Sequence, residues 1–570
     1  MTELEIRESR EEKSRSFASG VLILTLSAVI VKIIGLVYKI PMLTLLGSEG
    51  MGYFNSAYEI YTLFGVVSTA GLPVAMSVMI SSARSRGEGS VKRIFSVSMT
   101  LFLLLGIAGS ALMLALAHPF SLLLKSDKTI YCIWAISPTV FFVCLSSVYR
   151  GFFQGLGKMT QTAISQVIEA LLKLVLGLLF AFVALSYGFE VEIVAAFAVM
   201  GLTLGTVVSA IYLLISKRLC REGEIGGAAK SGAAEEKSPS TKKRAAEMSA
   251  VGEKGAAEMS AVGKKKGARR STVSGEGVLR SLLRIAIPVT LSSAVISLTK
   301  IIDMAVILRR MQDVGFTNSE AFSSYGNYTT LALPLFSLAP ALISSVALPL
   351  VPSLSSAVAA GDREGQTTVA RDAIRLTMLV AMPISLGLCF FSREILTLLF
   401  SGQTEAIAES APLLSTLALS VVLACLITVG NAILQAYSRA GLPIISMIAG
   451  SIFKVVLAYL MIGNSSIGLM GAPISTFFCD LVINALNFYF IGKYLPEQLS
   501  VSELMVKPFV SALVSIGAGR LIYALAERYF GGSTVLTLSS IALCAMLYLP
   551  ISSAFGVVSR EDVKSFLRRR

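Results

Sequence analysis

The chain has 570 residues, of which 54% are hydrophobic and 15% are charged, and its formal net charge is +14. A soluble domain of this composition would expose too much apolar surface, so the composition excludes an ordinary soluble protein. The positive charge alone would suit a nucleic-acid-binding protein, but its placement along the chain excludes that class, because it follows a membrane topology.

Apolar runs long enough to cross a bilayer core of about 30 Å recur from Phe17 to Val558. They predict an all-α integral membrane protein with about fourteen transmembrane helices, since the period-2 alternation of a transmembrane barrel is absent from the sequence. The predicted spans are centred near residues 28, 66, 104, 142, 173, 204, 296, 338, 380, 421, 452, 481, 517 and 546.

Basic residues gather in alternate connecting segments. The first 16 residues form a charged tail, which we expect to be an uncleaved cytoplasmic extension because no short apolar core with a cleavage site follows it. The other basic segments lie at 84–93, 158, 217–284, 363–375, 439, 493–507 and 568–570. The positive-inside rule then predicts that the N- and C-termini are both cytoplasmic, which requires an even number of spans.

Residues 217–277 differ from the rest of the chain in composition. They are low in large apolar residues, and the octapeptide AAEMSAVG occurs twice, eleven residues apart. Such a segment cannot bury enough surface to offset its ordering entropy, so we predict a disordered basic cytoplasmic linker that is a tether and topology signal. The predicted units are a tail at 1–16, an N-lobe at 17–216, the linker at 217–277, a C-lobe at 278–495, two added spans at 505–558 and a basic tail at 559–570.

The two lobes resemble each other in sequence. Residues 71–89 align with 347–365 at a shift of 276, and residues near 150–179 align with a later segment at a shift of 281. The second alignment places Gln154 on Gln435 and Lys173 on Lys454. Six spans before the linker and six after it, in the same orientation, predict two pseudo-symmetric lobes around a central cleft, an architecture typical of transporters.

Charged residues inside the predicted spans are the main functional signal. Each costs about 2.5–3.5 kcal/mol on insertion scales, so each requires a partner or a water-filled cavity. The lysines are Lys32, Lys39, Lys173, Lys300 and Lys454, with Arg150 near the end of span 4. The acidic residues are Glu59, Glu169, Asp303 and Asp480.

Local spacing leaves alternatives open for several of these lysines. Lys39 lies near a span end, where its side chain can snorkel to the interface. Lys173 stands four residues after Glu169, and Asp303 stands three residues after Lys300, so each pair either neutralises itself or faces a cavity. Lys454 has Gly450 in place of the local acid. Lys32 also has no acid within one turn.

Lysines without a local acid are expected to face a shared polar cavity. We predict a substrate-binding cavity formed by Lys32, Lys173, Lys300, Lys454 and Arg150, with Glu59, Glu169, Asp303 and Asp480 as coupling or charge partners. An excess of positive charge in such a cavity favours a phosphate or pyrophosphate group. His118 is interpreted as an interfacial residue, and the scattered seven cysteines indicate neither disulfides nor a metal site.

Two segments carry a family resemblance. LGSEGMGYFNSAYEIYTLFGVVSTAGLPVAMS (46–77) resembles the span 1–2 signature of the stage V sporulation protein B group, and RGFFQGLGKMTQTAISQVIE (150–169) resembles its span 4–5 turn. That group belongs to the multidrug/oligosaccharidyl-lipid/polysaccharide exporter superfamily. The resemblance implies a flippase for an undecaprenyl-pyrophosphate-linked saccharide such as lipid II, acting in peptidoglycan or polysaccharide assembly.

Comparison with related lipid II flippases implies a partly matching site. Those proteins carry two cavity arginines around a glycine in span 1. Lys32 matches the first of them, ahead of Gly35, whereas the second position is Tyr38 with Lys39 one residue later. Their cationic span 2 positions are not reproduced, since Glu59 stands there instead.

Two other functions remain as alternatives. A cation-coupled multidrug exporter would need intramembrane carboxylates where span 1 has lysines, and a non-catalytic scaffold of a cell-wall synthesis complex would need no cavity.

We expect no enzyme, because the outer loops are short and the one large loop is of low complexity. We expect no cofactor and no Walker phosphate-binding loop, so that energy comes from H+, Na+ or the membrane potential. The expected partners are a lipid-linked anionic oligosaccharide, membrane lipids and cell-wall synthesis proteins, but no nucleic acid.

Overall fold

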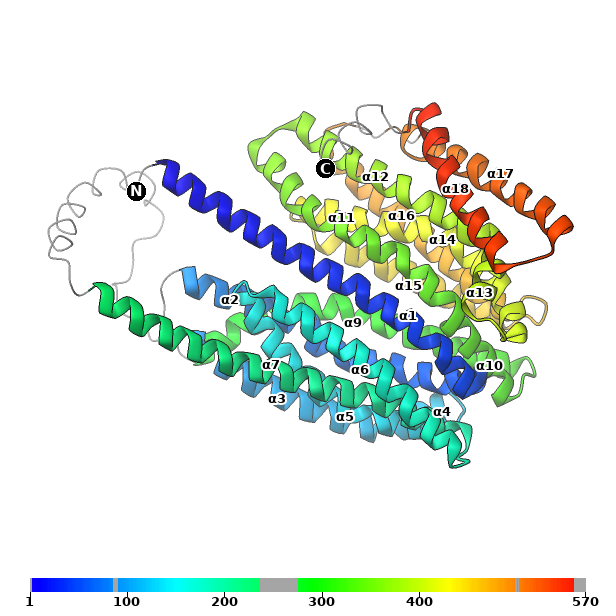
Figure 1. Cartoon of the computed structure of the whole chain (residues 1–570), viewed down its shortest axis with the longest axis horizontal. Helices are drawn as coiled ribbons and strands as arrows, with labels where there is room; N and C mark the ends of the chain where they lie inside the picture. The colour runs from blue at the N-terminus through cyan, green and yellow to red at the C-terminus, as the bar shows by residue number, and fades with distance from the viewer. Residues whose placement is uncertain (1–2, 86–90, 236–274, 498–499, 501, 558–570) are drawn as a thin grey trace.

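The computed structural model describes residues 3–85, 91–235, 275–497, 500 and 502–557. Within these residues every regular element is helical, which confirms the predicted all-α membrane fold. The helices run roughly side by side along one direction, as Figure 1 shows.

The first helix, α1 (Glu3–Thr69), contains a reversal of chain direction at Gly47. Gly47 has φ 65°, a left-handed conformation that glycine adopts without the steric cost of a Cβ atom. Figure 1 shows α1 crossing the molecule, turning back and continuing into α2 (Gly71–Ser85). Thirteen stretches of the described residues are long and apolar enough to span a membrane, and the first, Ile23–Ala83, holds both of these crossings. The predicted fourteen spans are therefore confirmed.

Residues 3–235, which include α1 and α2, are called here the N-half. Its remaining helices follow the predicted spans. They are α3 (Val91–Ala115), α4 (Ala117–Leu123), α5 (Thr129–Gly155), α6 (Met159–Ser186) and α7 (Val191–Glu235). Residues 217–235, which were predicted to be part of the disordered linker, are helical, because α7 continues through Glu235 and its alanine-rich end favours helix propagation. The part of the predicted linker at 236–274 and the predicted tail at 559–570 lie outside the described residues.

Residues 275–557, called here the C-half, contain the later spans and three short irregular turns. The elements are α9 (Gly275–Asp313), α10 (Asn318–Asn327), the π-helical turn η1 (Tyr328–Ala332), α11 (Leu333–Ala360), α12 (Arg363–Phe390), α13 (Ser392–Leu399), α14 (Thr404–Ala436), α15 (Gly441–Ile462), η2 (Gly468–Met470), α16 (Gly471–Tyr494), η3 (Ser502–Val506), α17 (Lys507–Phe530) and α18 (Thr534–Ala554).

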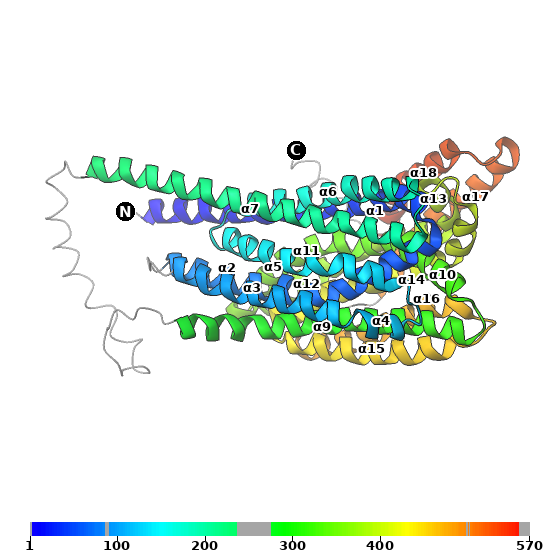
Figure 2. The same ribbon diagram turned by 90° about the horizontal axis from the view of Figure 1, so that it is seen from below.

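The two halves lie side by side, with α1 running between them (Figures 1 and 2). In the N-half, α6 packs on α7 and on α1, while α5 packs on α3 and α7. In the C-half, α14 packs on α11, α12 and α16, and the added pair α17 and α18 packs on α12. The exact lobe boundaries stay a prediction.

Small residues let the helices approach closely. A Cβ atom on Gly201 of α7 would overlap the backbone of Gly177 on α6. Between the halves, a Cβ atom on Gly52 of α1 would overlap the carbonyl of Phe322 on α10. A Cβ atom on Gly326 of α10 would overlap the carbonyl of Ser48 on α1. Such close contacts provide the van der Waals packing that holds helices together in lipid.

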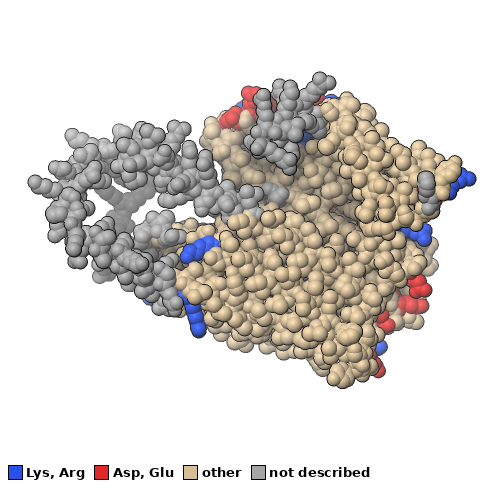
Figure 3. All heavy atoms as spheres, in the orientation of Figure 1, with Lys and Arg blue, Asp and Glu red and all other residues tan. Residues whose placement is uncertain are grey.

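The exterior suits a lipid environment. Large apolar side chains such as Leu104, Leu291 and Leu460 are more than 60% exposed. Figure 3 shows charged atoms near the two ends of the bundle and few between them on the visible face. The helices therefore present an apolar band to the bilayer.

The halves are tied together at the end that carries α4, α10 and α13, called here the distal end (Figure 1). Arg309 of α9 donates to the carbonyls of Leu123 (2.6 Å) and Leu122 (3.2 Å) at the end of α4. Gln312 donates to the next carbonyl, that of Leu124, at 3.3 Å. An ion pair at 2.8 Å joins Lys125 to Asp313 beside these contacts.

Candidate functional site

A cavity of about 780 Å³ is bounded by both halves of the molecule. Its wall comes from α1, α5, α6 and α7 of the N-half and from α9, α10, η1, α11, α15 and α16 of the C-half. The charged residues that line it are Lys32, Lys39, Glu59, Arg150, Glu169, Lys173, Lys300, Asp303 and Lys454. The structure thus brings together every predicted site residue except Asp480.

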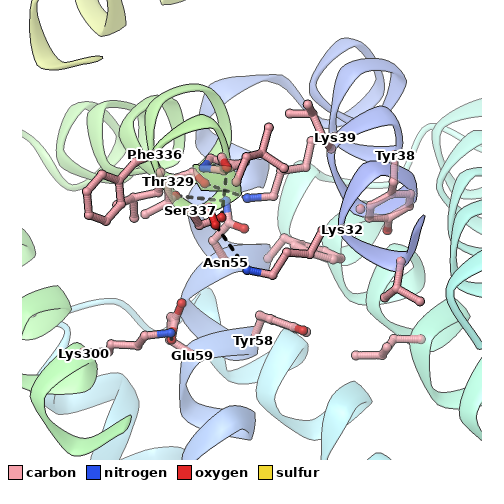
Figure 4. A pocket seen from close by; sticks show the side chains of 18 of the residues that line it. Lys32, Tyr38, Lys39, Asn55, Tyr58, Glu59, Lys300, Thr329, Phe336 and Ser337 are labelled. Carbon is pink, nitrogen blue, oxygen red and sulfur yellow. Dashed lines mark hydrogen bonds and ion pairs between the residues drawn. The ribbon is translucent and has the colours of Figure 1, made fainter. Parts of the chain in front are cut away.

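Two lysines of α1 reach across the cavity to backbone carbonyls of the C-half. Lys39 Nζ donates to the carbonyl of Thr329 at 2.6 Å, and Lys32 Nζ donates to that of Ser337 at 3.3 Å. The two lysines stand seven residues apart, so they lie on the same face of the helix. Figure 4 shows both side chains directed toward the η1–α11 segment. Lys39 therefore does not snorkel to the interface as expected, because Thr329 offers it an acceptor inside the protein.

The carbonyl of Thr329 is available because the helix is irregular at this point. In an α-helix its donor would be the N–H of Leu333, but that N–H bonds to Tyr328, five residues back, in the π-helical turn. The next N–H in π register would be that of residue 334, which is proline and has none. Lys39 supplies the donor that the backbone lacks.

Asn55 anchors the same irregular turn from the returning part of α1. Its amide nitrogen lies 3.0 Å from the hydroxyl of Thr329 and 2.9 Å from that of Thr330. All three side chains are buried. The two crossings formed by α1 thus hold η1 at adjacent positions, one through an ammonium group and one through a neutral amide.

Lys173 of α6 lies among aromatic rings rather than beside a carboxylate. Its Nζ is 4.5 Å from the ring centroid of Tyr58 and 5.4 Å from that of Tyr38, both on α1. Within the described residues it forms no ion pair with Glu169, one turn earlier. Of the two alternatives for Lys173, local neutralisation is therefore not found, because Glu169 points to another cation.

That other cation is Arg150 of α5. Its guanidinium pairs with Glu169 at 2.6 Å and also donates to the hydroxyls of Ser165 (3.0 Å) and Ser209 (3.2 Å). Thr206 of α7 donates to the other oxygen of Glu169 at 3.4 Å. This network ties α5, α6 and α7 together, so Arg150 lines the cavity with most of its donors already used.

Lys454 of α15 pairs with Asp303 of α9 at 2.8 Å. Its own helix offers no acid, as the sequence indicates, but the neighbouring helix α9 supplies the carboxylate, so Lys454 lines the cavity as one member of an ion pair. Lys300, which local spacing paired with Asp303, instead approaches Glu59 of α1 at 3.8 Å, as Figure 4 shows. Side chains of Lys454 and Asp303 are 15% and 14% exposed, whereas that of Lys300 is 57% exposed.

Asp480 does not line the cavity. It is buried on α16, in line with Asn484 and Asn487 at spacings of four and seven residues. Asn484 donates to the carbonyls of Leu423 and of Asp480, which ties α16 to α14. Asp480 is thus absent from the cavity lining, and its role as a coupling or charge partner stays a prediction.

Comparison with known proteins agrees with this arrangement. A model of the family described as polysaccharide biosynthesis protein matches residues 17–358. The chain belongs to the polysaccharide biosynthesis protein family. A second model, described as lipid II flippase MurJ, matches residues 256–543.

Individual relatives cover nearly the whole chain. Stage V sporulation protein B of Bacillus subtilis (strain 168) is 24% identical over 556 residues, which are 96% of this chain and 97% of that protein. A solved lipid II flippase MurJ in an inward closed conformation has a TM-score of 0.65 at 15% identity, covering 94% of this chain and 98% of that one. An inward-facing multidrug resistance MATE transporter of the MOP superfamily has a TM-score of 0.58 at 17% identity, covering 82% and 98%. These families are transporters, which confirms that this multi-pass membrane protein is not an enzyme.

The cavity of this family member carries an excess of positive charge. Six cations and three carboxylates line it, so its formal charge is +3. The carboxylates lie closest to Arg150, Lys300 and Lys454. The remaining three ammonium groups, on Lys32, Lys39 and Lys173, have only neutral partners among the described residues.

Sequence reasoning missed part of this site. Lys39 was left out of the predicted cavity, although its seven-residue spacing from Lys32 indicates a shared helix face. Asn55 and Thr329 were not identified, because neither residue type is unusual inside a membrane helix. Pro334 was the available signal, since a proline inside a span frees a carbonyl that needs another donor.

Proposed function

We propose that this protein moves undecaprenyl-pyrophosphate-linked saccharides, such as lipid II or a related wall or capsule precursor, across the bacterial cytoplasmic membrane. The observation that carries the proposal is the cavity charge of +3, with three ammonium groups that have no acidic partner within the described residues. Ammonium groups form strong charge-assisted hydrogen bonds with phosphate oxygens. The cavity volume of about 780 Å³ lies within the range of about 300–1,000 Å³ that is typical of ligand sites.

In the proposed cycle, the head group enters the cavity from the cytoplasmic side while the polyprenyl chain stays in the lipid. The N-lobe and C-lobe then rock against each other, so that the distal contacts open and the N-terminal end closes. The termini are cytoplasmic in this scheme, and the distal end faces outward. An inside-negative potential favours outward movement of an anion by about 2.3 kcal/mol per charge per 100 mV.

The same charges argue against the alternative of a cation-coupled multidrug exporter. An organic cation would enter a cavity that already carries six cationic side chains. Of the three carboxylates, Glu169 and Asp303 are engaged at 2.6 Å and 2.8 Å by their partners. A scaffold function would place no constraint on Lys32 or Lys173, which makes their substitution informative.

The test is transport by the purified protein in liposomes that contain a fluorescent lipid II analogue, with outer-leaflet label quenched chemically. We expect a Lys32→Met/Lys173→Met variant to lower the initial rate about 100-fold or more, since each of the two ammonium–phosphate contacts contributes about 1.5–3 kcal/mol. Lys507→Met is the matched control, because Lys507 stands at the start of the peripheral helix α17 and pairs only loosely with Glu503 at 3.9 Å.

The transport assay is read together with binding to cell-wall synthesis proteins and with drug efflux. Equal rates for the double variant and the Lys507 control would overturn the cationic site. Absence of any transport by the wild-type protein, together with intact binding to cell-wall synthesis proteins, would favour the scaffold. Drug efflux with unchanged lipid II movement would favour the multidrug exporter.

A further inference from the structure

The contact between Lys39 and Thr329 has a feature that the other cavity contacts lack. It joins α1 of the N-half to η1 of the C-half, and its acceptor is a carbonyl that the backbone cannot satisfy. The donor is a full positive charge, whereas the acceptor is neutral. Lys39 thus fills a structural requirement of the C-half with a group that is chemically suited to bind an anion.

An anion in the cavity would compete for this ammonium group. A hydrogen bond between ammonium and phosphate joins two ionised groups and is stronger than one between ammonium and a neutral carbonyl. Lys32 also donates to a neutral carbonyl of the C-half, that of Ser337, at the longer distance of 3.3 Å. Both lysines are therefore held by groups that a phosphate oxygen would displace.

We propose that Lys39 is a switching ligand, which holds the carbonyl of Thr329 across the two halves and transfers to the phosphate of the transported lipid when that lipid binds. The proposal rests on the proposed function, because it takes the same anionic head group as its ligand. Transfer of Lys39 removes one tie between α1 and η1 at the moment of loading. Substrate binding is thereby coupled to separation of the halves at this level of the membrane.

Asn55 explains why α1 and η1 do not separate completely when Lys39 leaves. Its amide bonds to the hydroxyls of Thr329 and Thr330 involve only neutral groups, so a phosphate has no comparable advantage there. The buried Asn55 contacts stay in place while Lys39 leaves. The η1 turn then serves as the pivot, consistent with the frequent occurrence of π-helical turns at functional sites.

Three variants separate the two roles of Lys39. Lys39→Gln keeps a donor for the carbonyl of Thr329 but has no charge for the phosphate. Lys39→Met lacks both. Pro334→Ala keeps the lysine but supplies an N–H in π register, which competes with Lys39 for that carbonyl. Pro340→Ala, a substitution of another proline within α11, is the matched control.

The measurement is the distance between spin labels on Cys residues introduced at Leu26 of α1 and Leu342 of α11, both exposed, in nanodiscs. Undecaprenyl pyrophosphate is the probe, and undecaprenol is its uncharged counterpart. We expect the pyrophosphate, but not the alcohol, to shift the distance distribution of the wild-type protein and of Pro340→Ala. Lys39→Met and Pro334→Ala should be shifted already without the probe. Lys39→Gln should bind undecaprenyl pyrophosphate at least about tenfold more weakly than the wild type, and its distance distribution should not shift when the probe is added.

The possible failures point to different proposals. If undecaprenyl pyrophosphate neither binds the wild-type protein nor shifts its distances, the proposed function is wrong. If it binds and shifts Lys39→Gln as it shifts the wild type, the switching role of Lys39 is wrong while the proposed function stands. Should Lys39→Met not fold, the comparison of Lys39→Gln with Pro334→Ala still decides the question.

Discussion

Lys173 and Lys454 hold matching positions in the internal repeat, yet their surroundings differ. Lys173 of α6 lies over the rings of Tyr38 and Tyr58, whereas Lys454 of α15 forms a buried ion pair with Asp303. The repeat therefore preserves the depth of the positive charge but not its neutralisation. One lysine remains available for an anion, and the other joins two helices.

The difference follows from where each half places its carboxylate. If Lys32 and Lys300 are equivalent positions of the first span in each half, Gly35 corresponds to Asp303. The N-half thus has glycine in that span and Glu169 beside its lysine, whereas the C-half has Asp303 in that span and Gly450 beside its lysine. Glu169 is held by Arg150, so the acid of the N-half never reaches Lys173.

The largest effect is expected from breaking the ion pair of the C-half. Lys454→Met or Asp303→Asn alone leaves one buried charge without its partner, which costs about 3–5 kcal/mol of stability. The double variant Lys454→Met/Asp303→Leu should recover much of that loss, because no charge remains unpaired. Thermal unfolding in detergent, followed by light scattering, checks this order of stability among the variants. Equal destabilisation by the double and single variants would contradict a direct pair.

Converting the N-half to the arrangement of the C-half should mainly affect transport. Gly35→Asp places a carboxylate at the position that corresponds to Asp303, and the Cβ of residue 35 meets no atom within 4 Å. We expect the flipping rate to fall about 10- to 100-fold, because the new acid neutralises a lysine that the phosphate needs. Gly35→Asn is the isosteric control and should transport nearly as the wild type does. Equal rates for the two variants would mean that cavity charge does not limit transport.

Close packing against α16 explains why residue 450 of the C-half is glycine, and a substitution can test this. A Cβ on Gly450 would overlap the side chain of Ile483 and lie 3.0 Å from the carbonyl of Cys479, both on α16. Gly450→Ala should therefore destabilise the protein by about 1–3 kcal/mol through overpacking. Gly441→Ala, at the start of the same helix with open space around its Cβ, is the control. Unfolding midpoints that do not differ between the two would show that α15 and α16 can move apart freely.

The smallest effect on stability is expected at Lys173. Lys173→Met removes two aromatic contacts worth about 0.5–1 kcal/mol each but leaves no unpaired charge behind. We expect its unfolding midpoint to stay close to that of the wild type and well above that of Lys454→Met. A loss as large as that of Lys454→Met would show that both halves use their lysine for structure.

The helices were predictable from sequence, but the ion pairs were not. Every predicted span centre falls in a helix, because apolar length and helical backbone pairing are imposed by the bilayer itself. The local pairs Glu169–Lys173 and Lys300–Asp303 were replaced by partners from other helices. Spacing along one helix shows which charges are near each other, but side-chain direction and the neighbouring helix decide which of them meet.

Like the helices, the gathering of charged residues in one cavity was predictable from the sequence. Unpaired lysines from four different spans need a common polar space, and Lys32, Lys173, Lys300 and Lys454 share one. The irregular turn at η1 was not predicted, since a proline indicates a kink but not the π register that precedes it. The role of Lys39 depends on that register and so could only be recognised in the structure.

The short helix α4 gives the distal end a dependence on solvent. The carbonyls of Leu122, Leu123 and Leu124 obtain donors from Arg309 and Gln312 of the other half. In the proposed cycle this end opens outward and water replaces these donors, so that each opening takes up several water molecules at the rim. If that cycle holds, high osmotic pressure from an excluded solute such as sucrose is expected to slow release of the lipid at the outer leaflet more than its loading from the inner leaflet.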